Sequence, residues 1–319
     1  MTFPLPLFEN LVKEKPRTNG KANKLDPQDR AFHDWYRFVL SFPPHLVRDY
    51  LDNFGVKKNN VVLDPFCGTG TTLVESKRRG LSSFGTEANS FAHFASKVKT
   101  DWEILSDLLL SQSKEIAKTA LRKLRTQGIN DEISFSGNIN DLSLSQLPDD
   151  ENKPILADSI SPLPLYKTIV LLETLKEFES ERVYQHQLLA LANALVFKIS
   201  NLHFEPEVGV GKPKYDVPVI TSWLSEIEKM ANDLRLIAGD DHAQSNAILA
   251  DARNLNEVLP ENSVDIVITS PPYPNEKDYT RITRLESVVL QQFPLPEVET
   301  RSFRKNFATK TIFTSGRFT

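Results

Sequence analysis

Cysteine, methionine and tryptophan are scarce in this sequence, because its 319 residues include one cysteine, two methionines and three tryptophans. The single cysteine, Cys67, excludes a disulfide framework and a cysteine-based zinc cluster, and the six histidines form no HxxxH pair. No apolar run approaches the length of about 18 residues that a membrane-spanning helix needs. Residues 1–10 lack the charged region, apolar core and cleavage site of a secretion signal. We therefore expect a cytoplasmic protein with no structural metal and no membrane partner.

An excess of charge of one sign is also missing, because 42 acidic residues face 38 basic ones and the formal net charge is -4. This balance neither supports nor excludes a nucleic-acid partner, since an acidic protein can carry one basic face. Hydrophobic residues make up 40% and charged residues 25% of the chain, as is usual for a globular protein. The length suits two domains of about 150 residues, or one domain with a large insertion.

The first third of the chain alternates between strand and helix signals. Apolar residues at 60–64 predict a strand that ends at Asp64, and a turn containing glycines and a helical stretch at 73–79 follow it. A second strand is predicted at 82–86; it ends at Glu87 and is followed by another helix. Two such units in succession predict an α/β fold with a mostly parallel, doubly wound sheet.

The alternation stops in the middle of the chain. Residues 101–240 have the composition and spacing of helices, and the strand signals resume after them. We therefore predict one sheet domain that is split into residues 31–100 and 241–319, with residues 101–240 as a mainly helical insertion. Residues 1–30 are polar and charged, and we expect them to form an arm.

The turn after the first predicted strand has the character of a binding loop. Gly68 and Gly70 let the backbone approach a ligand where a Cβ atom would collide with it. Their spacing matches neither GxGxxG nor a P-loop, so the ligand need not be a nucleoside phosphate. Glu87 is placed to accept hydrogen bonds from both hydroxyls of a ribose. Asp251, at the end of a third predicted strand, is placed to accept a hydrogen bond from an adenine amine. Structural carboxylates at strand ends are the alternative for both residues.

A fourth strand, predicted as continuous and buried at 263–269, runs straight into a Ser-Pro-Pro-Tyr tetrapeptide. Pro271 and Pro272 fix an extended turn without N–H donors, in which carbonyl oxygens point outward. The Ser270 side chain and the Pro271 carbonyl can accept both hydrogens of a planar amino group while Tyr273 stacks on the ring that bears it. A plain turn at the end of a strand is the alternative.

Together the two segments point to a family. Asp64-Pro-Phe-Cys-Gly-Thr-Gly-Thr-Thr72 and Thr269-Ser-Pro-Pro-Tyr273 resemble the DPFxGxGTT and [DNS]PP[YFW] motifs of the S-adenosylmethionine-dependent amino-methyltransferases of DNA. The resemblance implies S-adenosyl-L-methionine as cofactor and DNA as substrate. It implies that the four residues from Ser270 to Tyr273 bind a base flipped out of the duplex. It also implies a set of cofactor-binding residues: Asp64, Phe66, Gly68, Thr69, Gly70, Glu87, Asp251 and Ala252.

The resemblance also suggests details of the reaction. In this family SPPY occurs more often with N4 of cytosine than with N6 of adenine, which favours a cytosine-N4 enzyme that transfers the methyl group directly. Residues 101–240 lie where one class of these enzymes has its target-recognition region. The partners implied are DNA and either a cognate restriction endonuclease of a restriction-modification system or a second polypeptide that completes the sheet.

The sequence departs from the family at its carboxyl end. The family's sheet has seven strands, whereas we count four before Tyr273, and the residues that follow are too few for the remainder at usual element lengths. We therefore expect the sheet to be incomplete. Either the chain is an amino-methyltransferase, alone or with a second polypeptide, or it is a truncated, catalytically incompetent fragment that binds cofactor or nucleic acid. Methylation of an RNA base or a protein amide is a third hypothesis, ranked below these two.

Overall fold

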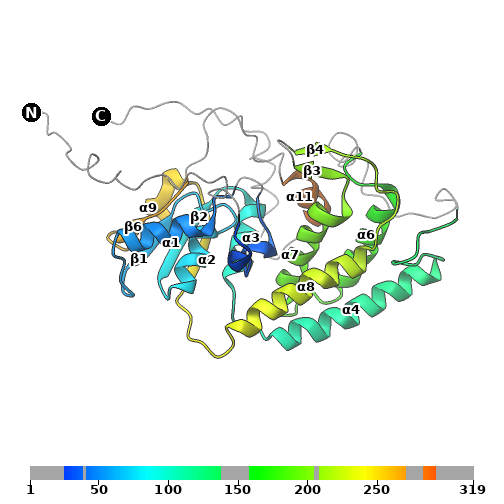
Figure 1. Ribbon diagram of the computed structural model, residues 1–319, viewed down its shortest axis with the longest axis horizontal. Helices are drawn as coiled ribbons and strands as arrows, with labels where there is room; N and C mark the ends of the chain where they lie inside the picture. Colours follow the sequence, from blue (N-terminus) through cyan, green and yellow to red (C-terminus); the bar gives the residue numbers. More distant parts are fainter. Residues whose placement is uncertain (1–24, 39–40, 138–157, 205–207, 271–282, 292–319) are drawn as a thin grey trace, which may run out of the picture.

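The computed structural model describes residues 25–38, 41–137, 158–204, 208–270 and 283–291, and everything below concerns these residues (Figure 1). A parallel β-sheet with its covering helices lies beside a group of longer helices (Figure 1). The sheet and its helices form the part drawn to the left in that view, and the longer helices form the part drawn to the right.

The sheet has four strands in the described residues: β1 (Val61–Asp64), β2 (Ser82–Glu87), β5 (Ser245–Leu249) and β6 (Ile266–Val267). Their order is β5-β2-β1-β6, and every pair is parallel. The register places Asp64 opposite Gly85, and Glu87 opposite Leu249. The predicted α/β fold with a mostly parallel sheet is confirmed, and the carboxyl ends of all four strands meet at one edge.

Three helices cover one face of this sheet. They are α1 (Pro44–Asn53), α2 (Thr71–Arg78) and α3 (Ser90–Thr100), and they contact one another in that order. Helix α1 packs Val47 and Leu51 against Val62 of β1 and Ile268 beyond β6. The four-residue spacing of Val47 and Leu51 brings them onto one side of the helix, which explains why this stretch forms an amphipathic helix at the sheet.

The prediction of a long, buried fourth strand is wrong. Strand β6 covers only Ile266–Val267, and the Val267 side chain is 53% exposed. Ile266 and Ile268 pack toward the cluster that contains α1, so Val267, between them, points to the other face. The apolar run is therefore split between the two faces of the strand, and only one of these faces is covered by described residues.

The long helices lie between β2 and β5 in the sequence. They are α4 (Ser106–Thr126), α6 (Pro162–Lys176), α7 (Tyr184–Ala194) and α8 (Val219–Leu236). They share one apolar core, at whose centre the Trp223 indole donates a hydrogen bond to the Gln187 carbonyl at 2.9 Å. The helical content predicted for this region is present, whereas the division of the chain into domains at residues 31–100, 101–240 and 241–319 remains a prediction.

One hairpin in this region was not predicted. Strands β3 (Leu202–Phe204) and β4 (Val208–Val210) pair in antiparallel fashion within the region that was predicted to be mainly helical. Asn201, directly before β3, holds the residues that follow β4. Its carbonyl accepts from the Gly211 N–H at 2.6 Å, and its side chain accepts from the Lys214 N–H at 2.7 Å. Strands of three residues carry too little alternation to be recognised from sequence, since a period of two needs about four residues or more.

Residues 25–38 connect the sheet to the long helices. The Trp35 indole and the Phe32 N–H both donate to Asp233 of α8, at 2.8 and 3.0 Å. On the other side, His33 is hydrogen-bonded to the fully buried Glu75 of α2 at 2.8 Å. The segment is thus held from both sides, which places the residues that follow Trp35 beside the carboxyl edge of the sheet.

Candidate cofactor and substrate site

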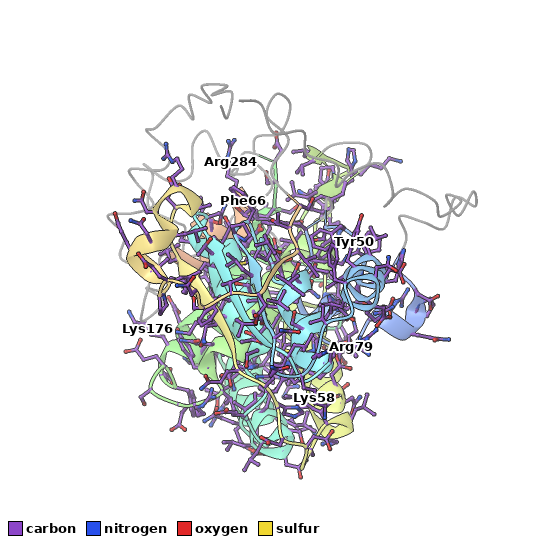
Figure 2. All side chains as sticks on the ribbon, turned by 90° about the vertical axis from the view of Figure 1, so that its left-hand side faces the viewer. Tyr50, Lys58, Phe66, Arg79, Lys176 and Arg284 are labelled. Atoms are coloured by element: carbon purple, nitrogen blue, oxygen red, sulfur yellow. The ribbon has the colours of Figure 1, made fainter. Side chains whose placement is uncertain are left out.

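The carboxyl edge of the sheet carries the predicted site. Lys58 precedes β1 and Phe66 follows it, and Figure 2 shows these two residues at opposite ends of the sheet. Phe66 is 40% exposed, which is high for a phenylalanine beside a buried strand. The predicted binding turn therefore begins with an accessible aromatic ring at this edge.

Backbone hydrogen bonds give the turn after β1 its shape. The Cys67 N–H donates to the Thr86 carbonyl of β2 at 3.0 Å, and the Gly70 N–H donates to the Cys67 carbonyl at 2.8 Å. Gly68 and Gly70 adopt φ angles of +53° and +83°, a region that costs other L-residues about 1–2 kcal/mol. The glycines are thus required by the path of the chain, and Gly70 also begins α2.

A clash adds to this requirement at Gly70, where a Cβ atom would lie 3.0 Å from Ser96 Cβ and 3.2 Å from Ser96 Cα. We expect Gly70→Ala to lower the free energy of unfolding by about 2–4 kcal/mol, from the unfavourable φ and the overpacking. Gly80→Ala is the matched control, because its φ of +69° is similar and no atom lies within 4 Å of its Cβ position. Urea denaturation of both variants measures the difference, and equal losses would show that Ser96 does not restrict the turn.

Glu87 connects the two strand ends. Its Oε2 accepts a hydrogen bond from the Gly68 N–H at 2.9 Å, and its Oε1 accepts one from the Asn89 N–H at 2.8 Å. Burial raises the pKa of the Glu87 carboxyl, and the N–H donors of Asn89 and Gly68 act in the opposite direction. The carboxylate therefore holds the binding turn in place while its remaining lone pairs are available to a ligand.

Asp64 has a different environment, because its side chain is fully buried. Its Oδ1 accepts from Thr269 Oγ1 at 2.7 Å and from the Phe66 N–H at 3.1 Å. Its Oδ2 has no hydrogen-bond partner among the described residues, and the same holds for the buried Oγ1 of Thr69. Burial raises the pKa of Asp64, and the bond from Thr269 opposes this shift. Unpaired buried oxygens of this kind are suited to a polar ligand.

Cys67 does not have the environment of a nucleophile. Its side chain is 4% exposed and occupies the space above Gly85, where a Cβ atom would lie 2.8 Å from Cys67 Sγ. Burial raises the pKa of the thiol well above its usual range, and the carboxylates of Asp64 and Glu87 add to this shift. The thiol therefore stays protonated and fills space between the turn and β2.

Asp251 and Ala252 lie at the end of the neighbouring strand. Strand β5 stops two residues before Asp251, and the Ala250 N–H donates to the Glu87 carbonyl at 3.1 Å. The Asp251 carboxylate accepts from the Arg253 backbone N–H at 2.9 Å and pairs with the Arg253 guanidinium, which is 86% exposed. Ala252 is half-buried at the start of the short helix η5 (Ala252–Asn254).

The Ser-Pro-Pro-Tyr tetrapeptide is described only at its first residue. Ser270 is exposed and directly follows Thr269, whose side chain is bonded to Asp64. Pro271, Pro272 and Tyr273 lie outside the described residues. The structure therefore brings Asp64, Gly68 and Glu87 together and places the start of the tetrapeptide next to them along the chain.

Comparison with known proteins agrees with this geometry. Residues 8–97 match the family model of the N6/N4 DNA methylases. The type II methyltransferase M.BsoBI of Geobacillus stearothermophilus is 25% identical over 308 residues, which cover 89% of this chain and 57% of that protein. The chain thus resembles the N6/N4 DNA methylases. It spans a little more than half the length of M.BsoBI.

Two further methylases match shorter stretches. M.MjaII of Methanocaldococcus jannaschii is 30% identical over 116 residues, or 34% of this chain and 19% of that protein. M.MvaI of Kocuria varians is 28% identical over 97 residues, or 30% of this chain and 21% of that protein. No solved structure gives a significant match.

Two kinds of feature are missing from the described part of this chain. No group of three or more His, Cys, Asp or Glu side chains there is arranged to hold a metal ion. None of the helices there is both long and apolar enough to cross a membrane.

The sequence did not single out two residues that border the turn. The Phe38 ring lies 3.9 Å from the Cβ position of Gly68, so it lines the binding turn from the amino-terminal segment. Asn89 begins α3, and its N–H is one of the two donors to Glu87. The usable signal for Asn89 was its preference for helix N-caps; nothing local indicated Phe38.

Proposed function

We propose that this chain catalyses, or contributes the catalytic core for, transfer of a methyl group from S-adenosylmethionine to an exocyclic amine of a DNA base. The observation that carries the proposal is the 2.7 Å hydrogen bond from Thr269 Oγ1 to Asp64 Oδ1. It ties the residue before Ser270 to the first residue of the binding turn, although 205 positions separate the two in sequence. Direct transfer requires donor and acceptor sites to be adjacent in this way.

The residues at the turn fit the cofactor. The unpaired oxygens of Asp64 and Thr69 provide polar contacts, Glu87 has lone pairs for ribose hydroxyls, and the exposed Phe66 ring provides an apolar wall. When bound, S-adenosylmethionine supplies an electrophilic methyl group. Asp251 and Ala252 are proposed to face the adenine; the Asp251 pair with Arg253 is exposed and is therefore weak enough to be exchanged for a ligand.

For the target base, we assign the chemistry to the Ser270–Tyr273 tetrapeptide. An exocyclic amine is a poor nucleophile because its lone pair is conjugated with the ring. When the Ser270 hydroxyl and the Pro271 carbonyl accept its two hydrogens, the nitrogen becomes pyramidal and its lone pair is directed at the methyl carbon. The N–C bond forms as the S–C bond breaks, and one amine proton then leaves to solvent. Tyr273 stacks on the flipped base.

Three finer assignments belong to the same proposal. The serine at position 270 favours N4 of cytosine over N6 of adenine. Residues 101–240 are proposed to contain the target-recognition region. A restriction endonuclease, or a second polypeptide that completes the sheet beyond β6, is the proposed partner besides DNA; the exposed Val267 on the outermost described strand is compatible with the second of these.

A labelling experiment tests the proposal. The full chain is incubated with tritiated S-adenosylmethionine and mixed-sequence DNA, the DNA is hydrolysed to nucleosides, and the labelled product is identified by mass. We expect N4-methyl-deoxycytidine. Labelled adenine would overturn the choice of base only. Cofactor binding without label on DNA would show that the chain alone is a binding module, and label on transfer RNA or protein instead would overturn DNA as the substrate.

A further inference from the structure

A buried polar pair links the amino-terminal segment to the helix that follows the tetrapeptide in sequence. The Tyr36 hydroxyl donates a hydrogen bond to Glu286 Oε1 of α11 (Arg284–Gln291). Tyr36 is 1% exposed and Glu286 is fully buried. The second oxygen of Glu286 has no hydrogen-bond partner among the described residues.

Tyr36 leads directly to the binding turn. Its ring meets the Phe38 ring edge-on, with a centroid distance of 6.3 Å, and Phe38 lies against Gly68. The buried Lys99 amine donates to the Tyr36 carbonyl at 3.1 Å, and the Phe91 ring packs edge-on against the Tyr36 ring with a centroid distance of 5.0 Å. Tyr36 is thus held by its hydroxyl, its carbonyl and its ring, and it links α11 to Phe38 beside the turn.

A second contact connects α11 to Glu87. The Asn89 side chain donates to Thr283 Oγ1, immediately before α11, at 3.4 Å. The N–H of the same Asn89 donates to Glu87 Oε1 at 2.8 Å. Thr283 is 1% exposed, so this contact is also in the interior. Both contacts therefore lead from the start of α11 to the groups that shape the cofactor site.

Stability alone does not explain the pair. A buried carboxyl with one unpaired oxygen costs free energy that a leucine of similar size would not. Burial raises the pKa of Glu286 to about 7, and the bond from Tyr36 opposes this shift. A residue that is costly in the core and that joins two parts of a site is better explained by a role in positioning them.

We infer that Tyr36 and Glu286 are positioning residues that fix α11, the first described element after Ser270, against the cofactor turn. Their role is to set the distance between the methyl donor and the target amine. The inference rests on the proposed function, which assigns the target amine to the segment that begins at Ser270. It predicts that the pair controls the rate of transfer more than the affinity for the cofactor.

Three variants test this role. Tyr36→Phe keeps the ring and removes the hydroxyl, and we expect kcat for transfer to fall about tenfold or more while the KM for S-adenosylmethionine changes by less than about threefold. Glu286→Gln keeps an oxygen that accepts from Tyr36 and should retain most of the activity. Tyr50→Phe is the control, because Tyr50 is an exposed tyrosine of α1 and lies outside both the proposed site and residues 101–240.

A second measurement does not depend on transfer. Hydrogen exchange of the α11 amides is followed with and without S-adenosylmethionine; we expect the cofactor to slow it in the wild type and in Glu286→Gln, and to have no effect in Tyr36→Phe. If the wild type transfers no methyl group but shows this protection, the proposed function fails and the coupling stands. If the wild type shows no protection, or if Tyr36→Phe keeps its kcat, or if Tyr36→Phe and Tyr50→Phe lose activity equally, the inference is overturned.

Discussion

Glu87→Ala is expected to weaken the binding of S-adenosylmethionine about 100-fold and to lower the free energy of unfolding by about 2–4 kcal/mol. The carboxylate accepts the N–H groups of Gly68 and Asn89, and alanine leaves both without an acceptor. A hydrogen bond to a charged group contributes about 1.5–3 kcal/mol, and a factor of ten in affinity corresponds to about 1.4 kcal/mol. The affinity falls because the ribose loses its acceptor and because the turn at Gly68 is no longer held in its binding conformation.

Calorimetric titration with the cofactor and urea denaturation measure the two effects separately. Glu87→Gln keeps one acceptor oxygen and should show an intermediate loss of both quantities, because only one of the two N–H groups remains paired. Glu115→Gln, at an exposed position of α4, is the control and should leave both unchanged. A Glu87→Ala variant that is less stable but binds the cofactor normally would reduce Glu87 to a structural residue.

The parts of this site that could be predicted from sequence are the local ones. The strand that ends at Asp64, the glycine turn and the strand that ends at Glu87 each follow from a short run of residues whose chemistry has few alternatives. Gly68 and Gly70 were predicted to let the backbone approach a ligand, which stays a prediction; their positive φ angles give a second reason for glycine at both positions. Parallel pairing of the two strands then places both carboxylates at the same edge.

The contacts between distant segments could not be predicted in this way. The bond from Thr269 to Asp64 depends on the register of β6 against β1, and a short apolar run specifies neither the register nor the face that each residue occupies. The same limitation led to the wrong prediction of a buried strand at Val267. The Tyr36–Glu286 pair joins residues 250 positions apart, and no local pattern marks either as a partner of the other.

Tyr273→Ala is expected to lower kcat/KM for DNA about 10- to 100-fold and to leave the affinity for S-adenosylmethionine within about twofold of the wild type. Stacking of a base on an aromatic side chain contributes about 1–3 kcal/mol, and alanine removes all of it. Tyr273 itself lies outside the described residues, so the expectation comes from the tetrapeptide and from the position of Ser270. The proposed cofactor contacts at Asp64 and Glu87 come from other strands, and we expect them to remain intact.

The conservative variant at this position decides what the ring does. Tyr273→Phe keeps the stacking surface and should transfer at close to the wild-type rate. If the hydroxyl were required, the transfer rates of Tyr273→Phe and Tyr273→Ala would fall equally. Filter assays with tritiated cofactor give kcat/KM, and calorimetry gives the cofactor affinity. Full activity of Tyr273→Ala would show that the base is bound elsewhere. Combined with Glu87→Ala, the experiment separates the two halves of the site, because one variant should lose transfer with normal cofactor binding and the other should lose cofactor binding itself.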